Sequence, residues 1–88
     1  MEWEAYGFIV AGKCRRSVCL ALLNHPKTPH EVSTEIGISP AHVSRALKEL
    51  VGQGIVRCLN PERRKGRVYS LTGLGLKVSK VMVKKEPT

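Results

Sequence analysis

Residues 28–51 read TPHEVSTEIGISPAHVSRALKELV and carry the start and stop signals of two consecutive helices. Thr28 is followed by Pro29 at the first helical position and by Glu31 three residues on, a pattern typical of a capping box. Gly37 is expected to end this short helix, because glycine readily adopts the left-handed conformation that closes helices.

A second helix is predicted directly after this turn, with Ser39 as its N-cap and Pro40 at its first position. Its apolar residues recur at the spacing of a helix with one buried face, and they are Val43, Ala46, Leu47, Leu50 and Val51. Two helices joined by so tight a turn form a helix-turn-helix.

The flanking segments complete a mainly α fold with one small hairpin. Residues 13–23 have one apolar stripe and predict a helix, whereas residues 3–12 fit either a strand or a helical lead-in interrupted by glycine. Two β-rich runs, Ile55–Leu59 and Arg67–Leu71, predict a two-stranded hairpin with a long tip, and Thr72 is the expected N-cap of a C-terminal helix. The expected fold is one domain over residues 1–88 with its core in about 13–80, comprising three helices, a two-stranded hairpin and a C-terminal helix.

The charge balance favours a polyanionic partner. The 88 residues contain 15 Lys and Arg against 7 Asp and Glu, and the formal net charge is +8. Nucleic acid is the favoured partner, an anionic membrane surface is the weaker alternative, and a well-solvated surface is the ordinary explanation. No apolar run approaches the roughly 20 residues of a membrane span, and no signal peptide is visible. We therefore expect a cytoplasmic, nucleoid-associated protein with no membrane partner.

The residues that face away from the apolar stripe of the helix at about 40–52 are candidates for reading the major groove of DNA. Arg45 can donate two hydrogen bonds to guanine, Ser44 can reach a phosphate or a base edge, and Ala41 can contact a thymine methyl. The full candidate set is Ser39, Ala41, His42, Ser44, Arg45 and Lys48, with Thr28 and His30 as weaker candidates at the start of the preceding helix. The alternative is an ordinary solvated helix surface.

A second candidate contact is the basic tip of the hairpin, where Arg63, Arg64, Lys65 and Arg67 surround one glycine and only Glu62 opposes them. Such a cluster suits phosphates or a minor groove, although a solvated charge run is the usual explanation.

No arrangement typical of catalysis is visible, so we expect no enzyme activity. The three histidines have no acid or thiol at ligand spacing, and there is no phosphate-binding glycine loop. The spacing of Cys14, Cys19 and Cys58 matches no zinc pattern, so they are interpreted as reduced, buried apolar residues, with a thiol redox switch as the alternative. No metal, cofactor or small-molecule ligand is expected.

Several segments together resemble a known family of regulators. The quoted helix-turn-helix, the following Gly54-Ile55-Val56, and residues 61–72 with Gly75 after them are similar to winged-helix transcriptional regulators of the MarR and ArsR type, in particular to small archaeal members. The resemblance implies that the third helix reads DNA, that the hairpin is a wing contacting phosphate or minor groove, and that the protein is a homodimer. It does not extend to the metal-ligand cysteine motif of the arsenic-responsive repressors, so metal sensing is not implied.

The sequence therefore predicts a sequence-specific, double-stranded DNA-binding transcriptional regulator. The alternatives are a protein-interaction module on the same fold and a non-specific architectural chromatin binder. A homodimer is expected to form through the N-terminal segment and the C-terminal helix, where Trp3, Phe8, Leu76 and Val83 fall outside the main apolar stripes. The alternative is that these four side chains pack inside one monomer.

Overall fold

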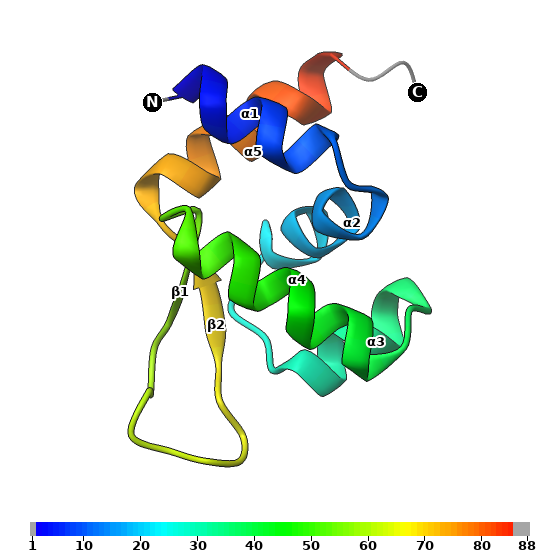
Figure 1. Ribbon diagram of the computed structural model, residues 1–88, viewed down its shortest axis with the longest axis vertical. Helices are drawn as coiled ribbons and strands as arrows, with labels where there is room; N and C mark the ends of the chain where they lie inside the picture. The colour runs from blue at the N-terminus through cyan, green and yellow to red at the C-terminus, as the bar shows by residue number, and fades with distance from the viewer. Residues whose placement is uncertain (1, 86–88) are drawn as a thin grey trace.

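The computed structural model describes residues 2–85, and within that range the chain forms five helices and a two-stranded antiparallel sheet. The elements are α1 (Glu2–Val10), α2 (Lys13–Leu22), α3 (Pro29–Ile36), α4 (Pro40–Gly52), β1 (Val56–Cys58), β2 (Tyr69–Leu71) and α5 (Gly73–Lys85). In Figure 1, α1 and α5 lie together at one end, α4 crosses the middle, and the hairpin projects away from the helices. The expected winged helix-turn-helix fold is confirmed.

The local signals of the helix-turn-helix act as the sequence predicts. The Thr28 hydroxyl accepts a hydrogen bond from the Glu31 amide at 3.1 Å, and the Glu31 carboxylate accepts one from the Thr28 amide at 2.8 Å. Gly37 adopts a φ of 69° at the end of α3. Ser39 caps α4 by accepting a hydrogen bond from the His42 amide at 3.4 Å. Because every partner lies within a few residues, these interactions specify locally where α3 begins and ends and where α4 begins.

Residues 3–12, for which the sequence is compatible with a strand or a helix, are helical up to Val10. Ala5 and Ile9 lie four residues apart on α1 and are both buried, which is the helical spacing of a core-facing stripe. The helix packs against α5 and α2. Burial against these two helices therefore outweighs the helix-weakening effect of Gly7.

The hairpin strands are shorter than expected. The two three-residue strands pair in the register Val56–Leu71 and Cys58–Tyr69, so the predicted runs 55–59 and 67–71 extend too far, mainly toward the tip of the hairpin. Tyr69 also pairs with Lys27 through two backbone hydrogen bonds of 3.0 and 2.8 Å. This bridge joins the base of the hairpin to the segment between α2 and α3.

The fully buried core is aliphatic, and it includes Ile9 and Met82 outside residues 13–80. Of the three cysteines only Cys19 is buried, whereas Cys14 and Cys58 are half-buried, so the prediction of three buried thiols was wrong for two of them. All three are free thiols.

The last helix begins as predicted. The Thr72 hydroxyl accepts a hydrogen bond from the Gly75 amide at 3.1 Å and donates to the Gly54 carbonyl at 2.6 Å. The Thr72 amide donates to the Ile55 carbonyl at 3.0 Å. One residue thus caps α5 and fastens it to the chain that enters the hairpin.

Candidate nucleic-acid interface

The exposed face of α4 and the base of the hairpin enclose a groove of about 500 Å³. Four of the predicted contact residues line it, namely Ser44, Arg45 and Lys48 from α4 and Arg67 from the hairpin. Helical periodicity places the first three on one side of α4, and the β1–β2 hairpin brings Arg67 opposite them. The groove therefore has a strongly cationic lining drawn from two segments about 20 residues apart in the chain.

Three residues of this groove were not among the sequence candidates: Val51, Cys58 and Tyr69. Val51 was expected in the buried stripe of α4, but its side chain is 41% exposed because it lies at the edge of that stripe. Tyr69 could have been found, since it lies two residues after Arg67 and alternate residues of an extended strand share a face. Cys58 is the cross-strand partner of Tyr69, so the strand register identifies it too.

The start of α4 presents exposed polar groups in a fixed arrangement. Ser39, Ala41 and His42 are all exposed. The Ser39 hydroxyl lies 2.9 Å from Nδ1 of His42, so the cap residue also orients the imidazole ring. His42 and Arg45 line a second depression of about 270 Å³, which opens toward α2. Arg45 thus borders both hollows of the α4 surface.

The tip of the hairpin carries three exposed cations, Arg63, Arg64 and Lys65, which we call the wing-tip cations. No interaction of these three side chains with a carboxylate is present among the ion pairs of the described residues. Repulsion among like charges this close raises the free energy of the isolated protein, and a bound polyanion relieves it.

Arg67 has a different environment from the wing-tip cations. Its Nε donates to the Arg63 carbonyl at 2.5 Å, and one terminal nitrogen donates to the Pro61 carbonyl at 3.1 Å. Asn60 bonds across the same loop, because it donates to the Gly66 carbonyl at 3.1 Å and accepts from the Val68 amide at 2.7 Å. These bonds replace the missing strand ladder and give the tip a defined shape.

The two weaker candidates lie at the start of α3, where Thr28 is half-buried in the capping box and His30 is exposed. The hydrogen bonds from the Thr28 amide and side chain hold the pKa of Glu31 below its ordinary value of 4.5. Nearby, the buried ammonium of Lys27 donates to the Ala21 carbonyl near the end of α2 and lies 3.3 Å from the Glu35 carboxylate. Lys27 therefore fastens α3 to the end of α2.

Within residues 2–85, no three His, Cys, Asp or Glu side chains lie close enough together to hold a metal ion. No helix in that range is long and apolar enough to cross a bilayer.

The fold and the cationic groove define a winged-helix protein, and structural comparison agrees. ZitR from Lactococcus lactis, in a variant form, is similar at a TM-score of 0.74 with 23% identity over 83% of this chain and 51% of the ZitR chain. A ZitR variant in complex with DNA is similar at a TM-score of 0.70 with 25% identity, over 82% of this chain and 50% of that ZitR chain. HlyU from Vibrio cholerae N16961 is similar at a TM-score of 0.75 with 17% identity, over 94% of this chain and 89% of the HlyU chain. The present chain spans about half the length of the ZitR chains.

A family model described as bacterial regulatory protein, arsR family, matches residues 13–57, which is just over half of the chain. The chain belongs to this family, and the predicted resemblance to ArsR-type regulators is confirmed. No curated protein matches the sequence significantly.

Proposed function

We propose that this protein is a sequence-specific, double-stranded DNA-binding transcriptional regulator. The observation that carries the proposal is the convergence of Arg45 and Lys48 on α4 with Arg67 on the hairpin around one groove. A net charge of +8 supports a polyanionic partner. Membership of the arsR family and the likeness to a ZitR variant in complex with DNA support DNA in particular.

In this proposal the first half of α4 enters the major groove, which is wide enough to admit a helix. Arg45 donates to guanine O6 and N7, and Ser44 and His42 reach neighbouring base edges or phosphates. Lys48 lies about one turn beyond Arg45 along α4, and it contacts a phosphate. The wing-tip cations contact the backbone or the adjacent minor groove, where they add affinity with little sequence preference.

The test begins with selection of bound fragments from genomic DNA and measurement of affinity by fluorescence anisotropy at two salt concentrations. A random-sequence duplex serves as competitor. Arg45→Ala should weaken binding to the selected site by about 1–3 kcal/mol and relax its preference there. Arg57→Ala, which removes an exposed cation from β1 on the strand face opposite the groove residue Cys58, is the control for loss of charge.

Three outcomes contradict the proposal or part of it. An unchanged affinity of Arg45→Ala for the selected site refutes the role of that residue. Binding that the random competitor abolishes indicates an architectural chromatin binder. Absence of binding to any duplex indicates an interaction module, whose partner a pull-down would then identify.

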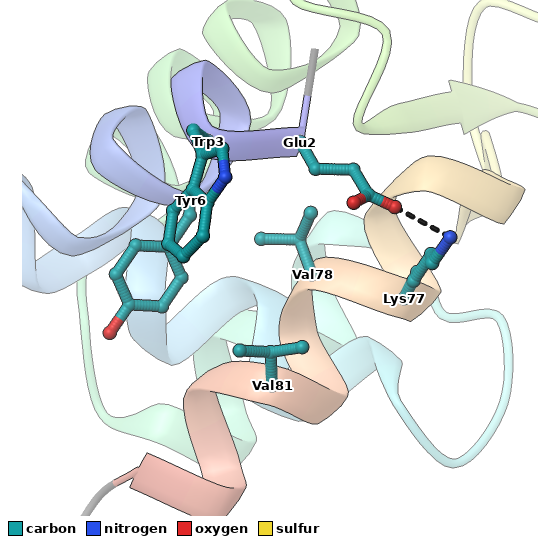
Figure 2. Close-up of a pocket in the computed structure, with 6 residues that line it drawn as sticks. All are labelled: Glu2, Trp3, Tyr6, Lys77, Val78 and Val81. Atoms are coloured by element: carbon teal, nitrogen blue, oxygen red, sulfur yellow. Dashed lines mark ion pairs between the residues drawn. The ribbon is translucent and has the colours of Figure 1, made fainter.

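The proposal includes a homodimer formed through α1 and α5. Trp3 is 75% exposed, and Leu76 and Val83 are 38% and 44% exposed, so all three are available for contact with a second copy of the chain. Figure 2 shows Trp3 beside Val78 and Val81 at a pocket of about 90 Å³ between the two helices, with the ion pair of Lys77 and Glu2 at its edge.

Phe8 differs from the other three residues expected at the interface. It is half-buried and packs against the core, so α1 offers Trp3 rather than both aromatic side chains. A symmetric pair would present two α4 helices to successive major grooves about 34 Å apart. Sedimentation equilibrium of the protein and of Trp3→Ser tests this, since a monomeric parent protein, or a variant that dimerises as well as the parent, contradicts the interface.

The regulatory family and fold support a protein that carries out no catalytic reaction, and we assign none. Acting on chromosomal DNA, the regulator would operate in the cytoplasm at the nucleoid.

A further inference from the structure

One cationic side chain outside the proposed DNA contacts joins three helices. The Nε of Arg15 on α2 donates to the Glu49 carboxylate on α4 at 3.3 Å. A terminal nitrogen of the same guanidinium donates to the Phe8 carbonyl near the end of α1 at 3.0 Å. The guanidinium also lies 3.9 Å from the centre of the Phe8 ring, within the range of a cation–π interaction.

The planar shape of arginine suits this position. The Phe8 carbonyl belongs to the last turn of α1, where carbonyl groups lack a backbone donor within the helix and need one from elsewhere. A guanidinium presents donors in several directions of one plane and can also stack on an aromatic ring. A lysine ammonium, as a point charge, cannot form the same set of contacts.

The turn between α1 and α2 leaves room for the arginine stem. An added Cβ at Gly12 would lie 3.0 Å from Cδ and 3.2 Å from Cγ of Arg15, which is closer than ordinary van der Waals contact. A side chain at this position would crowd the stem of Arg15. The absence of a side chain at Gly12 therefore leaves the space that the stem of Arg15 occupies.

Glu49 lies beside residues that the proposed function places near DNA. It lines the depression that also contains His42 and Arg45, and it is exposed. An unpaired carboxylate there would repel DNA phosphates. In the observed arrangement Arg15 lies between this carboxylate and α1, and it both neutralises the charge and ties α4 to α1.

We propose that Arg15 is a positioning residue that holds α4 in register with α1, through Glu49 on one side and Phe8 on the other. The part of this inference that concerns DNA rests on the proposed function, whereas the helix-to-helix coupling is a property of the free protein.

The test uses the full chain and a double-mutant cycle of Arg15→Met and Glu49→Gln, with Arg57→Met on β1 as the control for loss of one positive charge. Arg15→Met should weaken binding to the selected duplex about five-fold more than the control, within the range that positioning contacts carry. In the Glu49→Gln background most of this extra loss should disappear. The inference is overturned if Arg15→Met weakens DNA binding no more than the control does. It is also overturned if the loss of affinity caused by Arg15→Met is the same with and without Glu49→Gln.

Amide hydrogen exchange of the free protein separates this inference from the proposed function. Arg15→Met should raise exchange at the end of α1 and along α4, whereas Arg57→Met should not. Gly12→Ala, which crowds Arg15 without removing any of its atoms, should shift exchange in the same direction and serves as a second variant if Arg15→Met folds poorly. Unchanged exchange in α1 and α4 overturns the coupling even if DNA binding is confirmed, and raised exchange supports it even if no DNA binds.

Discussion

The replacement of Gly75 by alanine is expected to destabilise the protein sharply. Gly75 is buried in the first turn of α5, and its backbone passes directly over the chain at Ile55. An added Cβ would overlap the Ile55 carbonyl oxygen and lie 3.0 Å from its carbonyl carbon. Since the obstacle is backbone, no rotation of a side chain can relieve the overlap, and α5 must move away from β1.

The magnitude follows from the interactions at this crossing. Forcing extra volume into a packed site costs about 1–3 kcal/mol and occasionally more. Movement of α5 also stretches the two hydrogen bonds from Thr72 to the Ile55 carbonyl, of 3.0 and 3.1 Å, each worth about 1 kcal/mol. The better helix propensity of alanine offsets up to about 1 kcal/mol. We expect a net loss of about 2–4 kcal/mol in the free energy of unfolding.

Thermal unfolding followed by circular dichroism measures this loss. At about 4–8 °C per kcal/mol for a domain of this size, the Tm should fall by about 8–30 °C. Gly73→Ala is the matched control, because it lies in the same turn of α5 and an added Cβ there meets nothing within 4 Å. A Tm of Gly75→Ala within about 3 °C of that control would refute the close packing of α5 on the residue before β1.

Three further predictions concern the wing, α3 and the thiols. Replacing all three wing-tip cations by alanine should weaken binding to every duplex. The slope of log affinity against log salt should become shallower by about 0.9 for each phosphate that the wing no longer neutralises. An unchanged slope contradicts a role of the wing in DNA binding. Because Thr28 lowers the pKa of Glu31 below 4.5, the carboxylate stabilises α3 at higher pH and this stability should disappear as pH falls through the lowered pKa. Thermal unfolding between pH 6 and pH 3 measures it, and a Glu31→Gln variant that keeps the same pH dependence would exclude this source. Burial raises the pKa of Cys19 to about 12. Iodoacetamide at pH 8 should therefore alkylate the half-buried Cys58 long before Cys19, as mass spectrometry would show.

The helix-turn-helix could be predicted from the sequence because its determinants are local. Each cap residue finds its partner within three positions, and Gly37 closes α3 by its own conformation. The same regularity placed Ser44, Arg45 and Lys48 on one face of α4, since a helix fixes the directions of its side chains. The hairpin was also predictable, although its strands proved shorter, because side chains of Asn60 and Arg67 take over the hydrogen bonding toward the tip.

Other features depend on contacts between residues far apart in the chain. The conformation of residues 3–12 is decided by burial of Ala5 and Ile9 against α2 and α5, which no local pattern reveals. The groove needs α4 and the hairpin side by side, and the bridge between Lys27 and Tyr69 is part of what holds the base of the hairpin there.

The sequence by itself thus determined the helices of residues 2–85 other than α1, the caps of α3, α4 and α5 and the cationic faces, because each depends on neighbours along the chain. Only the tertiary structure decided which faces meet. Arg15 illustrates the difference, since its charge was visible in the sequence while its partners, 7 and 34 residues away, were not. Burial of a common aliphatic core brings such residues together, and the pairing of side chains at its edge follows from that packing.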